Sequence, residues 1–575
     1  MQIIKKLSQI LNRRLKIKLL FLVVGIIVGA ILETVALAVI SPFISIMLDN
    51  SSIQNNDFLR VLCVVFGFNN SNSLLAFLAF SIASIYVFQG VYLFIIAKIK
   101  YRFLSNLQIK LSLKLLITIL RRPYLYHVNK NIAEHQRVIL TDAENLIKMI
   151  TAVLSLAADL FMSVFILIFL LVQSVLMTLS VIGLALICVI FYFKVFRKRV
   201  KKAGEENRRK FIDMTKSVIQ TLGGIKELKV LHREIYFTEK FKTFSNKYAK
   251  SNQNFQVYSS IPKLLIESTC FGGAFILIGC LIVYGVNIEN LVPQLSLFVL
   301  ASFRLLPAIN RVISYINSIV FYKTSVDAVY INLYDNQNEF QNIISDALIE
   351  ESEDIVISNI TFQYPDTRTA ILENVSLRIP CRKSVAFIGH TGAGKTTLAD
   401  IILGIYSPQS GNMFYNGKSI HSDLEEWKKH IGYIPQQIYL LDESILRNVA
   451  FGVTDNEIDE KQVWKVLKKA QIREFVESLP NGVNTVVGDR GVRLSGGQRQ
   501  RIGIARALYS DPDILVLDEA TSSLDNETEK AVIEALESFK GDKTMIVIAH
   551  RLSTIENCDI VYRIDNKSVY CERWC

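Results

Sequence analysis

Six apolar segments dominate the first 320 residues, and each is long enough to cross a lipid bilayer as a helix. A backbone inside hydrocarbon must satisfy its own hydrogen bonds, so such segments predict transmembrane α-helices. Basic residues precede the first segment, as in a signal peptide. That segment is too long for one, contains Glu33 and continues past Ala36, which favours an uncleaved span. The predicted spans are 19–48, 73–98, 147–173, 175–194, 260–284 and 291–318.

Lysine and arginine are distributed unevenly between the connecting segments. They are frequent before the first span and in 98–146 and 194–259, whereas 49–72, 174 and 285–290 contain only Arg60. The positive-inside rule therefore predicts that both termini are cytoplasmic. The same rule explains the basic excess of the chain, with 64 Lys and Arg against 52 Asp and Glu, without a nucleic-acid partner.

The two long basic segments have a helical pattern and are too long for structureless loops. We expect them to continue the spans far into the cytosol as helices, with a short crosswise helix in 220–234 beside a Gly pair. The segment 56–68 is too short to cross and is expected to be an amphipathic helix on the outer surface, or else an extension of the second span.

The cysteine pattern predicts neither a metal site nor a disulfide framework. The eight cysteines form no Cys-x-x-Cys pair and no cluster with histidine, and Cys571 and Cys575 in the tail are isolated.

A different pattern begins near Glu353, where short apolar strands alternate with helical stretches. The chain is thus divided into a six-helix transmembrane domain (1–325), a linker (326–352) and an α/β P-loop NTPase domain (353–575). The strand ending at Ile388 is followed by GHTGAGKTT and a helix, which matches the phosphate-loop pattern in its required context. Its glycines would let backbone N–H groups surround phosphate at a helix N-terminus, with Lys395 on the β- and γ-phosphates and Thr396 on Mg²⁺.

A second strand, ILVLDE at 514–519, ends in two acidic residues. This arrangement would place Asp518 near Mg²⁺ and Glu519 where it can polarise the attacking water. Together with the phosphate loop, it predicts an ATPase.

LSGGQ at 494–498, followed by RQRIGIARAL, resembles the signature of ABC transporter ATPase domains. The resemblance implies ATP and Mg²⁺ as ligands and Glu519, His550 and Gln436 as catalytic residues. It implies Thr396, Gln436 and Asp518 at the metal. It also implies nucleotide contacts from Tyr364, which would stack on adenine, and from Gly389, His390, Thr391, Gly392, Ala393, Gly394, Lys395, Thr396, Thr397, Ser495, Gly496, Gly497, Gln498 and Asp525.

In this family the signature of one domain completes the ATP site of another, so one chain with one of each implies a homodimer. Six spans ahead of one ATPase domain resemble the exporter class, which implies ATP-driven alternating access. Two departures from the usual motifs are small: Asp489 stands where exporters commonly have Glu, and Ser523 where Ala is common.

Basic residues inside or at the ends of the spans are the candidates for binding cargo. They are Lys98, Lys263, Arg304 and Arg311. Three of them could instead reach the interface, and Arg304 could pair with Glu33 at a similar depth. Functionally, they could form a cationic cavity for a phosphate-bearing headgroup.

The first-span sequence ETVALAVISPFISIM and the last-span sequence FVLASFRLLPAINR resemble bacterial lipid-linked oligosaccharide flippases of the protein N-glycosylation type. This resemblance implies a multi-pass protein of the inner (cytoplasmic) membrane that moves a polyprenyl-pyrophosphate glycan and contacts membrane lipids. An exporter of lipids or hydrophobic drugs is the alternative, and an ATP-gated channel or regulator is a further one.

Overall fold

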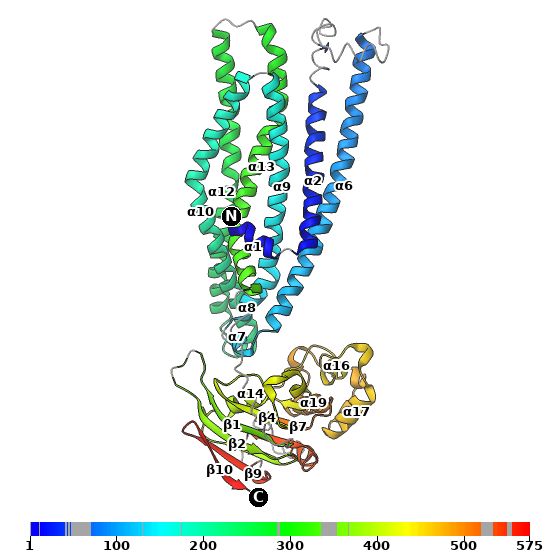
Figure 1. Cartoon of the computed structure of the whole chain (residues 1–575), viewed down its shortest axis with the longest axis vertical. Helices are drawn as coiled ribbons and strands as arrows, with labels where there is room; N and C mark the ends of the chain where they lie inside the picture. The colour runs from blue at the N-terminus through cyan, green and yellow to red at the C-terminus, as the bar shows by residue number, and fades with distance from the viewer. Residues whose placement is uncertain are drawn as a thin grey trace. The chain divides into compact units, whose positions relative to one another are not determined.

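The computed structural model (Figure 1) describes the chain apart from residues 1, 11, 41–42, 44–45, 48–70, 129, 174, 284–287, 335–352, 366, 368, 519–532, 549–554 and 575. The chain divides into two compact units. The first consists of Met1–Arg122 and Tyr126–Glu339, and the second of Pro123–Leu125 and Phe340–Cys575.

The first unit is helical. Its long helices are α2 (Arg13–Ala38), α6 (Ser71–Leu120), α9 (Ala143–Gln173), α10 (Val175–Gly223), α12 (Glu234–Val283) and α13 (Ile288–Tyr334). The shorter elements are α1 (Gln2–Ile10), α8 (Ile132–Gln136), the π-helix η1 (Arg137–Asp142) and α11 (Ile225–Val230). Helix α7 (Tyr124–Val128) is divided between the two units.

Three helical stretches among the described residues are long and apolar enough to cross a membrane: Arg13–Ala36, Asn72–Leu120 and Ile132–Val172. They contain most of the first three expected spans, although α2 ends at Ala38, ten residues before the expected limit. The other three expected spans fall on α10, α12 and α13, where many side chains lie outside the description. The expected surface helix at 56–68 also lies outside the described residues.

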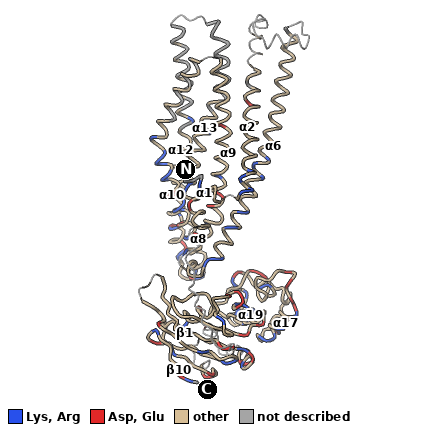
Figure 2. The backbone as a smooth tube through the Cα atoms, viewed as in Figure 1, with Lys and Arg blue, Asp and Glu red and all other residues tan. Residues whose placement is uncertain are grey.

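The expectation that the basic segments continue as helices is confirmed. Helices α6 and α12 have 50 residues each and α10 has 49, so each is about 75 Å long, more than twice the hydrocarbon thickness. The short helix α11 lies between α10 and α12, inside the segment where a crosswise helix was expected. Figure 2 shows that Lys and Arg gather towards one end of this helical unit.

A leucine repeat on α6 forms part of the core of this unit. Leu104, Leu107, Leu111 and Leu115 are spaced by three or four residues, so they share one helix face, and all are at most 4% exposed. They pack in one cluster with residues of α9 and α13, including Leu146 and Val326.

The basic segment 98–146 contains a buried polar network. Asp142, with no exposed side chain, accepts hydrogen bonds from Arg208 Nε (3.2 Å) on α10 and Ser325 Oγ (2.8 Å) on α13. Arg137, whose side chain is 1% exposed, lies with its Nε 3.4 Å from Asp142 and over the ring of Phe211. The π-helix that contains both residues is therefore joined to α10 and to α13.

The expected linker 326–352 begins inside a helix, because α13 continues to Tyr334. Residues 335–352 are outside the description.

The second unit contains two sheets. A four-stranded antiparallel sheet has the order β2-β1-β4-β5, and a six-stranded sheet has the order β10-β9-β3-β8-β7-β6. In the second sheet, β9, β3, β8, β7 and β6 are parallel, and β10 pairs antiparallel at one edge. The strands are β1 (Ile355–Phe362), β2 (Leu372–Ile379), β3 (Ser384–Ile388), β4 (Ser410–Tyr415), β5 (Lys418–Ser419), β6 (Ile431–Ile434), β7 (Ile514–Asp518), β8 (Thr544–Ile548), β9 (Ile560–Asp565) and β10 (Ser568–Trp574).

The helices of this unit belong to two hydrophobic cores. Helix α14 (Lys395–Ile402) packs in the core that includes both sheets, whereas α16, α17 and α19 pack in a second core with the other face of the six-stranded sheet. The helices are α14, α15 (Leu424–Lys429), α16 (Ile445–Val449), α17 (Glu460–Lys469), α18 (Arg473–Ser478) and α19 (Gly496–Leu508), with short 3-10 turns η2 (Ile420–Ser422), η3 (Asp455–Glu457), η4 (Gly482–Asn484) and η5 (Asp489–Gly491).

Candidate functional site

The phosphate loop connects the buried strand β3 to α14, as the sequence pattern predicts. A side chain at Gly389 is excluded, since a Cβ there would lie 2.3 Å from the carbonyl oxygen of Ile564. Gly394, at the N-cap of α14, has a φ of +103°, a left-handed conformation that favours glycine. The loop therefore presents backbone at a helix N-terminus, the arrangement that binds phosphate.

Lys395 is held inside this loop. Lys395 is only 5% exposed. Its Nζ donates hydrogen bonds to the carbonyl oxygens of Gly389 (2.8 Å) and His390 (3.1 Å). These two hydrogen bonds place the ammonium beside the backbone of the loop. His390 itself is exposed, with its Nδ1 2.9 Å from the carbonyl oxygen of Thr391.

The remaining candidates follow the parallel strands of the six-stranded sheet. Asp518 is the last residue of β7, and Gln436 lies two residues beyond β6. The carboxyl ends of parallel strands share one edge of a sheet, where α/β proteins bind ligands, so these residues and the phosphate loop lie along the same edge. Glu519, Asp525 and His550 are outside the described residues, and their roles remain predictions.

Asp400 is a member of this site that sequence reasoning missed. Burial, and then the negative charge of Asp518, raise the pKa of Asp400 to about 6. The negative charge of Asp518 thus acts on Asp400, although burial is the larger cause of the raised pKa. The spacing in the sequence could have identified Asp400, because it is four residues after Thr396 and faces the same side of α14.

Tyr364 lies beside the phosphate-loop helix. Its hydroxyl is 3.0 Å from the hydroxyl of Thr397, and its ring packs at 85° to Phe362 with the centroids 5.1 Å apart. Stacking of Tyr364 on adenine remains a prediction.

The signature sequence begins α19 with a capping box. Ser495 Oγ accepts from the backbone N–H of Gln498 (3.2 Å), and Gln498 Oε1 accepts from the backbone N–H of Ser495 (2.8 Å). Gly496 is exposed and Gly497 buried. The motif thus forms a helix N-terminus suited to an anion.

Arg506 joins the signature helix to the segment that follows Gln436. Its guanidinium donates to the carbonyl oxygens of Tyr439 and Asn448, both at 2.8 Å, and to Asn448 Oδ1 at 3.1 Å. Burial lowers the pKa of Arg506 to about 10. Because Asn448 also bonds the backbone of Leu441, the signature helix and the segment after β6 form one hydrogen-bonded body.

In the helical unit, the four cargo candidates differ in their surroundings. Arg311 binds Asp159 of α9 in two places, with Nε–Oδ2 at 2.7 Å and Nη2–Oδ1 at 3.0 Å. Lys98 and Lys263 are exposed. The side chain of Arg304 is outside the description, so its pairing with Glu33 remains untested.

The residues at the sheet edge fit ATP with Mg²⁺. The loop offers backbone donors and an ammonium for phosphates, and the carboxylates of Asp518 and Asp400 supply negative charge for a cation. This arrangement can orient a phosphate chain and stabilise charge on the transferred phosphoryl group.

Comparison with known proteins gives matches over both units. Residues 19–305 match the ABC transporter transmembrane region, and residues 372–522 match the ABC transporter family. The ATP-dependent lipid A-core flippase of Cupriavidus pinatubonensis is 27% identical over 469 residues, 81% of this chain and 79% of that protein. The flippase of the same name from Pseudoalteromonas translucida is 45% identical over 217 residues, 37% of each chain.

A solved structure agrees with the fold of the whole chain. A bacterial Atm1-family ABC exporter with ATP bound has a TM-score of 0.78 and 22% identity, and the match covers 97% of this chain and 95% of the other. With a transmembrane region and an ATPase domain on one polypeptide, the chain belongs to the ABC transporter family as a half-transporter, a multi-pass membrane protein that couples ATP hydrolysis to transport.

Proposed function

We propose that this transporter flips a lipid-linked oligosaccharide, a glycan joined to a polyprenyl chain by pyrophosphate, across the inner (cytoplasmic) membrane. The observation that supports a glycolipid cargo is the match over 81% of the chain to a protein named ATP-dependent lipid A-core flippase. The polyprenyl-pyrophosphate form of that cargo rests on the resemblance of the first and last spans. Cationic residues at Lys98, Lys263 and Arg304 add support, since arginine and lysine bind phosphate groups.

The working unit in this proposal is a homodimer with two ATP sites. Each site combines the phosphate loop of one chain with Ser495 and Gly497 of the other. Within a site, Lys395 and the loop N–H groups would hold the phosphates. Thr396, Asp518 and Gln436 would hold Mg²⁺, whose positive charge would offset the negative charge of the phosphates. Glu519 accepts the proton of the attacking water, and His550 contacts the γ-phosphate.

The proposed orientation places both termini in the cytoplasm. Basic residues lie in the halves of α6, α10 and α12 that extend beyond the apolar stretches, and these ends gather together in the helical unit (Figure 2). The positive-inside rule assigns that end to the cytoplasm. The long extensions would transmit the closing and opening of the ATPase domains to the spans.

Reconstitution in liposomes tests the proposed cargo. A fluorescent lipid-linked oligosaccharide is placed in both leaflets, and a membrane-impermeant quencher reports how much is accessible as ATP is added. We expect ATP-dependent movement with the natural chain and none with the matched control Lys395→Ala, which is designed to lose phosphate binding. ATP-dependent export of a hydrophobic drug without movement of the glycolipid would favour the alternative, an exporter of lipids or hydrophobic drugs.

A further inference from the structure

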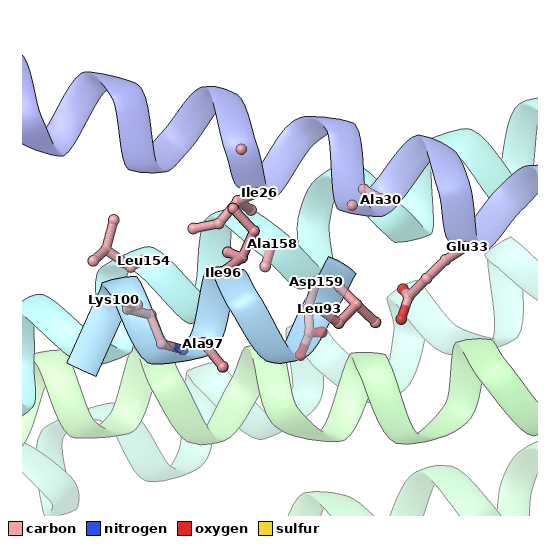
Figure 3. Close-up of a pocket in the computed structure, with 12 residues that line it drawn as sticks. Ile26, Ala30, Glu33, Leu93, Ile96, Ala97, Lys100, Leu154, Ala158 and Asp159 are labelled. Atoms are coloured by element: carbon pink, nitrogen blue, oxygen red, sulfur yellow. The ribbon is translucent and has the colours of Figure 1, made fainter. Parts of the chain in front are cut away.

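A largely apolar pocket of about 170 Å³ lies inside the helical unit, between α2, α6 and α9 (Figure 3). It is separate from the ATP site. Its ionisable lining residues are Glu33 from α2, Lys100 from α6 and Asp159 from α9. The apolar lining includes Ile26, Ile96 and Leu154. Ionisable groups in such an apolar region mark a functional site by default.

The pocket exists where two helices approach closely. Tyr92 Oη of α6 donates to the carbonyl oxygen of Gly25 on α2 (2.9 Å). A Cβ at Gly25 would lie 2.8 Å from Ile96 Cδ1, so a larger residue there would displace the Ile96 side chain. Gly29, Ala30, Ala97 and Ala158 also line the pocket, and their small side chains leave the space open.

The charges in this pocket are not equally compensated. Asp159 is neutralised by the bidentate contact with Arg311. Among the described residues, Lys100 forms no hydrogen bond or ion pair, and its ammonium lies 5.1 Å from the ring centroid of Tyr101. A half-buried ammonium without an acceptor is costly, and an anion that enters the pocket would supply one.

The ammonium of Lys100 and the carboxylate of Glu33 are separated along the pocket. Leu93 and Lys100 both line it and are seven residues apart on α6, so it extends about 10 Å along that helix. Figure 3 shows Lys100 towards one end and Glu33 towards the other. An anion at Lys100 and a neutral hydrogen-bond donor near the carboxylates would therefore both be accommodated.

We propose that this pocket binds the sugar-phosphate part of a lipid headgroup. Phosphate lies against Lys100, and hydroxyl groups of the attached sugar donate hydrogen bonds to Glu33 and Asp159. The pocket is smaller than the roughly 300–1,000 Å³ of sites that enclose whole small molecules, so it holds the first part of a headgroup and leaves the remainder outside. The sugar-bearing ligand rests on the proposed function, whereas phosphate binding at Lys100 does not.

Equilibrium binding to the full-length protein in phosphatidylcholine nanodiscs tests the site. The probe is a fluorescent polyprenyl-pyrophosphate carrying one hexose, with ATP absent. Lys100→Ala should weaken binding about tenfold, the loss of one charge-assisted contact, while Lys100→Arg keeps most of it. The matched control is Lys110→Ala, an exposed lysine on the same helix that does not line the pocket. Equal binding by Lys100→Ala and Lys110→Ala would overturn the proposal.

A variant that fills the pocket tests the location of the binding site without removing a charge. Ala97→Leu fills the pocket and should abolish binding of the probe, and normal binding would contradict the proposed location. The fold of each variant is checked by its basal ATPase activity, since neither residue belongs to the ATP site.

Competitors identify the ligand. Unlabelled sugar-bearing lipid should displace the probe better than polyprenyl phosphate without sugar, and Glu33→Gln should reduce this preference. Equal competition by phosphatidylglycerol or by free pyrophosphate would overturn the assignment to a sugar-phosphate headgroup. If Lys100 binds the probe but liposomes show no glycolipid transport, the proposed function fails and the site stands. If transport occurs and Lys100→Ala binds normally, the site fails.

Discussion

At Asp400, burial and the charge of Asp518 raise the pKa to about 6 from an ordinary value of 3.8. Between these values the folded protein keeps a proton that the unfolded chain has lost, so the free energy of unfolding falls as pH rises through this window. Above pH 6 the full destabilisation is present. The charged carboxylate is therefore tolerated at neutral pH at the expense of stability, which suits a position beside a cation site.

Replacing Asp400 with Asn should remove this pH response. We expect Asp400→Asn to raise the free energy of unfolding by about 1–3 kcal/mol near pH 8, and the gain should shrink as pH falls towards 4. Thermal unfolding of the full-length protein across this range provides the measurement. Asp542→Asn, at an exposed position, is the control. A gain of equal size at every pH would contradict the assignment.

Glu519 follows Asp518 directly at the end of β7. Glutamine keeps the shape of the side chain and cannot take a proton from water, so Glu519→Gln should lower the ATP turnover at least a hundredfold while ATP still binds. Turnover and nucleotide retention are measured on the same sample. Normal turnover would remove the general-base role.

Among the elements, α19 begins after Ser495, which caps the helix and is also proposed to contact ATP. Alanine there loses the cap and should destabilise the domain by about 1 kcal/mol. Aspartate caps a helix as well as serine does, yet it adds a negative charge where the proposal places ATP phosphate. Ser495→Asp should therefore keep the melting temperature and lose ATPase activity. Retained activity would show that no phosphate approaches this helix.

A second prediction concerns the pairing of α9 with α13. Arg311→Leu leaves Asp159 without its bidentate partner, and Asp159→Leu does the reverse, so each should destabilise the protein by about 1 kcal/mol or more. The double leucine variant should recover most of this loss because neither charge remains. Additive losses in melting temperature would mean that the two side chains do not stabilise each other.

For the whole molecule, the proposed homodimer predicts complementation between two inactive variants. Lys395→Ala affects the phosphate loop and Ser495→Asp the signature, so each homodimer has two defective sites. In a mixed dimer, both defects fall in one site and the other site is intact. Coexpression should recover roughly a quarter of the natural ATPase activity if chains pair at random. No recovery after isolation of doubly tagged dimers would argue against sites shared between two chains.

Much of the architecture could be predicted from local sequence patterns. Long apolar runs followed by basic helical segments predicted helices that extend far past a bilayer, because both properties depend on nearby residues. The phosphate loop was predictable for the same reason, since its glycines and Lys395 act through backbone that is close in sequence.

Pairings between distant helices could not be predicted in this way. The sequence indicated that Arg311 was either interfacial or a cargo ligand, whereas it contacts Asp159, 152 residues away. Asp142 lay in a segment interpreted as a cytosolic extension, yet it is fully buried because α9, α10 and α13 converge on it. The faces that helices turn towards one another are set by packing of the whole unit.

The contact between Arg311 and Asp159 also has an electrical consequence. A single charge that moves across the membrane field exchanges about 2.3 kcal/mol with it for every 100 mV. Arg311 and Asp159 carry opposite charges and are held by two hydrogen bonds, so together they form a neutral body. While the contact persists, membrane voltage does no net work on this pair, and α9 and α13 can shift together at this level without drawing on the membrane potential.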